Sequence, residues 1–308
     1  MPSTLYRNAG IVIFLTMMAA VAEFGGVHEA IFPEAGALCI GLWLMPKAVW
    51  NVRLRQVPLW LTAAAVIGLC INLLLASVCF EIRYALAFCL VAIMLRLVRC
   101  NMYPVVSAAM LPVLTGTTSW EYPACVLVIS LLLAVGRIWF PQTDRTEYQS
   151  FGLLHWSKLT VALCAILAFV GVTKSLNSQF SILNYLVVPP LVVTMIEFAN
   201  RKSGFRQRPY SILGLIFAAA VTGTSAEYLH RVLGILPMTL GTMISVVVML
   251  LLFRRFKPFA PALAIVLVPM LLPTSVLLWF PVLVTLGSLW FIGVGILCPT
   301  KEKTSSLS

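Results

Sequence analysis

The sequence predicts an all-α polytopic membrane protein with about twelve transmembrane segments, arranged as two parallel six-segment repeats. Three observations predict this fold. The 308 residues are 61% hydrophobic and only 10% charged, with a mean hydropathy of +1.01, whereas about 25% of residues are charged in an ordinary soluble domain. Apolar runs follow one another along the chain, and short motifs recur half a chain apart. The lipid bilayer is therefore the expected solvent for most of the chain.

Twelve apolar segments can be drawn from the hydropathy pattern, and several lie near the lower limit of about 20 residues for a full crossing. The second, fifth and eleventh segments are short and interrupted by proline or glycine, which favours broken or re-entrant helices. In order, the segments are 9–27, 30–46, 57–77, 80–98, 101–117, 120–140, 153–173, 181–199, 209–229, 236–253, 258–273 and 275–297.

The basic residues predict the orientation. With both termini cytoplasmic and all twelve segments crossing, 18 of the 21 Lys and Arg residues fall on the cytoplasmic side and 3 fall outside. This asymmetry follows the positive-inside rule and favours a multi-pass protein of the plasma membrane. It also explains the net charge of +11, because the basic residues lie singly or in small groups between apolar runs. Nucleic acid is therefore not an expected partner.

Two motifs of the first half recur in the second. Residues 55–58 (Arg-Gln-Val-Pro) match residues 206–209 (Arg-Gln-Arg-Pro), and the prolines of 104–112 match those of 261–269 at the same spacing. Six crossings in each half give both copies the same orientation, so the repeats are expected to be parallel, a common construction of secondary transporters. A polar stretch separates them, which gives an N-terminal membrane repeat, 1–148, and a C-terminal one, 149–308.

Two of the ten acidic residues are candidate coupling groups. Glu34 follows Pro33 and precedes Gly36, where proline frees backbone groups and small residues allow close approach. Glu197 lies on the corresponding segment of the second repeat, where it could also pair with nearby basic residues. An ionisable side chain in a membrane segment is costly and indicates a function, so either could carry a coupling proton. Interfacial solvation is expected near the outer segment ends, for Glu23, Glu29, Glu81, Glu121 and Glu227.

The repeated prolines predict a permeation or binding path. Such breaks in a membrane helix persist where they are buried in protein or line a watery cavity, and simple helix kinks are the alternative interpretation. Tyr103 and Ser107 are the polar side chains beside the first proline pair. The candidate substrate-binding or coupling residues are Glu34, Glu197, Pro33, Gly36, Tyr103, Pro104, Ser107, Pro261 and Pro269.

Two hydroxyl-rich stretches, 115–122 and 222–228, look alike. They could bind a small anion through hydroxyl and backbone N–H groups, or they could be outer loops. The three histidines are far apart and show no metal-binding spacing, so we expect neither a metal nor another cofactor. The absence of a Walker A motif excludes ATP-driven pumping by this chain alone.

Each half resembles the HPP family of membrane proteins, which is named for a His-Pro-Pro motif. Residues 206–214 look like the loop and glycine-bearing helix of that family, and residues 103–107 and 260–264 stand where the family motif would lie. The histidine is absent there, and a double proline occurs only at Pro189-Pro190. The resemblance implies anion transport, with nitrite movement into plastids as the suggested case. The proline-rich six-helix half also resembles aromatic-acid exporters of the fusaric-acid type.

We therefore expect a secondary transporter of a small anionic or amphipathic solute, in which the two repeats rock around a midplane site. The expected partners are the lipid bilayer, the solute and a coupling proton or ion, and no enzymatic activity is expected. A passive anion channel, a membrane-embedded enzyme and a partner-binding subunit are the alternatives. The sequence leaves the solute, the direction of transport, the coupling ion and the oligomeric state open.

Overall fold

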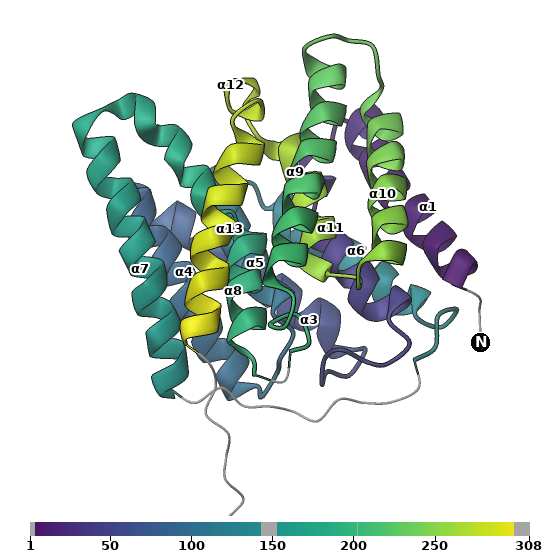
Figure 1. Cartoon of the computed structure of the whole chain (residues 1–308), viewed down its shortest axis with the longest axis horizontal. Helices are drawn as coiled ribbons and strands as arrows, with labels where there is room; N and C mark the ends of the chain where they lie inside the picture. Colours follow the sequence, from purple (N-terminus) through teal and green to yellow (C-terminus); the bar gives the residue numbers. More distant parts are fainter. Residues whose placement is uncertain (1–3, 143–152, 202, 299–308) are drawn as a thin grey trace, which may run out of the picture.

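The computed structural model describes residues 4–142, 153–201 and 203–298, and these ranges contain helices and no strands (Figure 1). The predicted all-helical class is therefore confirmed. Seven helical stretches of the described ranges are long and apolar enough to cross a membrane, which agrees with a membrane-embedded protein. They are α1 (Thr4–Gly25), α3 (Gln56–Leu74), α7 (Leu153–Leu176), the stretch Gln179–Ala199, α9 (Pro209–Arg231), α10 (Met238–Arg255) and α13 (Phe280–Leu297).

Shorter or more polar helices lie between these seven stretches, and the stretch Gln179–Ala199 itself divides into a 3₁₀ segment and a short α-helix. They are the 3₁₀ turn η1 (His28–Ala30), α2 (Glu34–Cys39) with its π-helical continuation η2 (Ile40–Leu44), α4 (Phe80–Leu97), α5 (Pro104–Thr115), α6 (Glu121–Gly136), α8 (Pro189–Ala199) after the 3₁₀ segment η3 (Ser178–Val187), α11 (Ala260–Leu267) with its 3₁₀ continuation η4 (Val268–Leu271), and α12 (Thr274–Leu277).

The predicted second, fifth and eleventh segments are short helices, as their proline and glycine content indicates. The eighth segment, drawn as one regular run, is also broken: it is 3₁₀-helical up to Val187, and α8 begins only at Pro189. Pro189 and Pro190 have no backbone N–H to continue a helical ladder from η3, so they start a new helix instead. Pro104 likewise begins α5, and the second residue of α11 is Pro261.

The short helices α2, α5, α8 and α11 form the centre of the molecule. Almost every residue of these four helices is buried, whereas the long helices expose large apolar side chains on one face, as α1 does with Ile13 and Met17. Apolar surface of this extent is the surface that lipid covers. Irregular backbone adjoins three of these helices, at η2, η3 and η4, and a membrane protein tolerates such backbone only where other protein surrounds it or where it lines a watery cavity.

The packing pairs elements from the two halves of the chain in a reciprocal way. Helix α2 packs against α11 and α5 packs against α8; α1 packs against α10 and α7 packs against α4. Figure 1 places α7 and α1 at opposite ends of the long axis, with α5, α8 and α11 between them. The seam between the halves therefore runs through the central short helices.

Candidate functional site

Glu34 is the first residue of α2 and lies at the centre of the molecule. The residue is only 1% exposed, and neither carboxylate oxygen has a hydrogen-bond partner within the described ranges. A buried carboxylate in a membrane protein normally has a cation or several N–H donors beside it, because an isolated charge is costly in a low-dielectric medium. Glu34 is therefore a group that the fold alone does not explain.

Three polar side chains lie near the Glu34 carboxyl. Ser107 of α5 interacts with the carboxyl, but its buried hydroxyl makes no hydrogen bond of good geometry to any described residue. Tyr84 of α4 and Tyr122 of α6 are within electrostatic range of Glu34. Their hydroxyls donate to backbone carbonyls instead, Tyr84 to Val187 and Tyr122 to Ala108 (2.8 Å for the latter). Of these four side chains, only Glu34 and Ser107 therefore lack a hydrogen-bond partner among the described residues.

The backbone of the second half comes close to this site. Gly36, one half-turn beyond Glu34, lies against the backbone of Leu263 in α11, and a Cβ on Gly36 would be 2.8 Å from the Leu263 carbonyl oxygen. The bond from Tyr84 to Val187 joins α4 to the residue just before α8. The carboxyl of Glu34 thus lies where short helices of both halves meet.

The remaining predicted site residues are distributed along the short helices. Tyr103 and Pro104 lie at the start of α5, about one turn before Ser107, and Pro261 lies two residues before Leu263. Pro269 lies in η4, at the other end of that helix from Pro261. Glu197 is partly buried near the end of α8, whereas Glu34 begins α2, so the two carboxylates occupy non-equivalent positions. The structure therefore brings together Pro33, Glu34, Gly36 and Ser107, and it leaves Glu197 outside this group.

The expectation that the outer acidic residues are solvated is wrong for Glu227, and two others, both half-buried, also have protein partners. Glu23 accepts hydrogen bonds from the backbone N–H groups of Met238 (3.0 Å) and Thr239 (2.8 Å), and so caps α10 from another helix. Glu81 of α4 forms an ion pair with Lys174 of α7 at 2.8 Å. Glu227 is 2% exposed and pairs with Arg231. Adjacent helix ends and basic side chains supply these partners, which hydropathy alone does not reveal.

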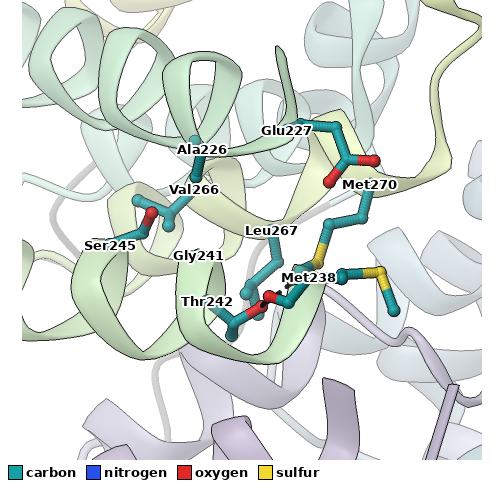
Figure 2. A pocket seen from close by; sticks show the side chains of 10 residues that line it. Ala226, Glu227, Met238, Gly241, Thr242, Ser245, Val266, Leu267 and Met270 are labelled. Carbon is teal, nitrogen blue, oxygen red and sulfur yellow. Dashed lines mark hydrogen bonds between the residues drawn. The ribbon is translucent and has the colours of Figure 1, made fainter. Parts of the chain in front are cut away.

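Glu227 also lines a small cavity between α9, α10 and the α11–η4 segment (Figure 2). Its volume of about 10 Å³ has room for about one water molecule. Thr242 donates to the Met238 carbonyl (2.9 Å), while the hydroxyl of Ser245 makes no hydrogen bond to the part of the chain that the structure describes. Because Arg231 neutralises Glu227, this carboxylate is a weaker candidate for proton coupling than Glu34.

The two hydroxyl-rich stretches differ in structure. Residues 115–122 contain the turn after α5, where Gly116 adopts a positive φ of 72°, in agreement with a loop. Residues 222–228 lie inside α9, so the loop interpretation is wrong for this stretch. Its glycine and hydroxyl residues serve close packing between helices instead.

Two arginines that the positive-inside count includes have a structural role. Arg7 of α1 is buried and donates to the carbonyls of Trp43, at the end of η2, and of Pro141 (2.8 Å for the latter). Arg206 donates to the carbonyls of Phe198, near the end of α8, and of Gly295 (2.9 Å) in α13. The last carbonyls of a helix lack intrahelical partners, so each arginine caps one short helix in its own half.

Comparisons of the chain with models of protein families, with characterised proteins and with solved structures find no match. Within the described ranges, no three His, Cys, Asp or Glu residues gather in a group that could hold a metal ion.

Proposed function

We propose that this chain is a proton-coupled secondary transporter of a small anionic or amphipathic solute, and that its two halves rock around Glu34. One observation carries the proposal. Glu34 is a buried carboxyl without a hydrogen-bond partner within the described ranges, and it lies at the seam between the two halves. Intramembrane carboxylates of this kind mark proton and ion pathways.

The proposed architecture is two parallel repeats of six crossings each, α1–α6 and α7–α13, with both termini on the cytoplasmic side of the plasma membrane. The reciprocal packing of α1 with α10 and α7 with α4 supports it, as does that of α2 with α11 and α5 with α8. The prolines in the first turns of α5 and α11 add to this support. Repeats of this kind allow alternating access around a site near the midplane.

The coupling follows from the cost of a charge in the closed seam. An ionised Glu34 needs water or a cation, and the closed seam offers neither among the described side chains near it. A protonated Glu34 can donate to the Ser107 hydroxyl, so the halves would change between inward- and outward-open states only with the proton bound. Breaks in the short helices provide the irregular backbone on which a solute could bind. The resemblance of each half to the HPP family favours an anionic solute.

The test uses the full-length chain in liposomes that contain a pH-sensitive dye. A panel of small carboxylates and inorganic anions is added outside, and a transported solute should change the internal pH. In Glu34→Gln this proton movement should fall to the level of empty liposomes while exchange of labelled solute continues, because exchange needs no net proton transfer. Glu121→Gln is the matched control, since Glu121 is exposed at the start of α6.

Counterflow separates the carrier from a passive channel, because only a carrier is stimulated by solute on the opposite side. Undiminished pH-driven uptake in Glu34→Gln would contradict the coupling role of Glu34. Absence of trans-stimulation for a solute that the protein does pass would favour a channel instead.

A further inference from the structure

A second cavity lies at the end of the molecule where α3 begins and α6 ends. Its volume is about 410 Å³, and its lining includes Trp50, Arg53, Arg55 and Arg137. The first three residues precede α3, and Arg137 follows the last residue of α6. Among the residues that the structure describes, no acidic side chain lines this cavity, which we name the arginine pocket.

We propose that the arginine pocket binds a phosphate group, and that in the membrane this group belongs to the head of an anionic phospholipid. Guanidinium groups match the geometry of phosphate oxygens and offer several donors in a fixed plane. Three of them line one cavity, and the cavity is far larger than a single water molecule requires.

Arg53 and Arg55 differ from the two arginines that cap short helices. The guanidinium groups of Arg7 and Arg206 are committed to backbone carbonyls. The side chains of Arg53 and Arg55 are exposed and make no hydrogen bond or ion pair to any residue of the described ranges. Arg7 thus has a structural role in this half, whereas the charges of Arg53 and Arg55 are available to a ligand.

Trp50 gives an independent indication of a ligand. The residue is 5% exposed, and its indole N–H makes no hydrogen bond to any residue that the structure describes. Its six-membered ring packs on Gly41, where an added Cβ would be 2.1 Å from the ring. Most buried N–H groups in proteins have an acceptor. Because the indole nitrogen is itself buried, an oxygen of a bound phosphate would become its acceptor only after the Trp50 ring shifts toward the pocket.

The surroundings of the pocket favour a lipid as the source of the phosphate. Ile138 and Trp139 follow Arg137 directly, and Leu59 lies in the first turn of α3; all three are exposed apolar residues. Tryptophan is enriched at the level of lipid headgroups, and acyl chains can cover such a surface. Basic pockets on the cytoplasmic side of membrane proteins face the leaflet that is rich in anionic lipid.

The test measures binding to the full-length protein in an uncharged detergent. Dioleoylphosphatidylglycerol, dioleoylphosphatidylcholine, inorganic phosphate and glycerol 3-phosphate are titrated separately, and native mass spectrometry and thermal unfolding report binding. We expect phosphatidylglycerol to remain bound and to raise the unfolding temperature. The double variant Arg53→Gln/Arg55→Gln should weaken this binding on the order of tenfold. Trp50→Phe, which keeps an aromatic ring and removes the N–H, should weaken it less.

Arg254→Gln/Arg255→Gln is the control, because these exposed arginines at the end of α10 carry the same charge away from the pocket. Stabilisation by inorganic phosphate or glycerol 3-phosphate, abolished in the pocket variant only, would support the phosphate site and assign it to a soluble ligand. The proposal is overturned if none of the four compounds binds, or if the control variant loses as much binding as the pocket variant.

Discussion

Gly68 of α3 lies directly against the backbone carbonyl of Ala109 in α5, and a Cβ on Gly68 would be 2.1 Å from that oxygen. Gly223 of α9 has the same relationship to Val266 of α11, at 2.2 Å. In each half, a long helix thus contacts a short central helix backbone to backbone. Close packing through small residues is a main source of attraction between helices in lipid.

Alanine at either glycine should therefore destabilise the protein. Gly68→Ala and Gly223→Ala each force the carbonyl and its helix to move, which typically costs about 1–3 kcal/mol. Gly214→Ala is the control, because nothing lies within 4 Å of a Cβ at Gly214 of α9. Thermal unfolding in detergent measures the change, and equal unfolding temperatures for all three variants would contradict the close approach.

Removing the Glu34 carboxyl should stabilise the fold and should also abolish proton coupling. Methionine at position 34 has a similar volume and no buried polar group to satisfy, so the free energy of unfolding should rise by about 1–3 kcal/mol. Functional sites often carry such a trade-off between stability and activity. The comparison is Glu121→Met, whose unfolding should be nearly unchanged because Glu121 is exposed. A less stable Glu34→Met protein would show that the carboxyl has a structural partner.

Loss of either capping arginine should open the end of a short helix. Arg7→Gln and Arg206→Gln each leave two or more carbonyls unpaired, at a cost of about 1.5–3 kcal/mol for hydrogen bonds to a charged donor. Arg7→Lys should recover only part of this free energy, since an ammonium group lacks the planar fork that reaches two carbonyls. Unfolding of Arg254→Gln provides the reference for an exposed arginine.

The proposed parallel orientation can be tested by labelling single cysteines in a background without the other cysteines. Cys79 lies in the loop between α3 and α4, and Ile235→Cys falls in the loop between α9 and α10; both positions are exposed. A membrane-impermeant maleimide added to intact cells should label both. Gln207→Cys, exposed before α9, should react only after the cells are permeabilised. Labelling of the first two positions from opposite sides would indicate inverted repeats.

The sequence predicts where helices form and where several of them break, because apolar runs and prolines act locally. The burial of Glu34 is also predictable, since Pro33 and Gly36 mark a segment that must pack closely. The burial of Glu227 is not, because it depends on α10 and η4 packing over the end of α9. The roles of Arg7 and Arg206 cannot be predicted either, because their partners are backbone carbonyls, and every residue type has such a carbonyl.

The cap that Glu23 places on α10 joins residues more than 200 positions apart. During synthesis, the first helix therefore enters the bilayer long before α10 has been made. Until then, α1 contacts lipid alone or the insertion machinery. Each half, made separately, would expose the face that the other normally covers, since α1 binds to α10 and α7 to α4. Assembly of this molecule is consequently a late event, completed only when the final third of the chain has been inserted.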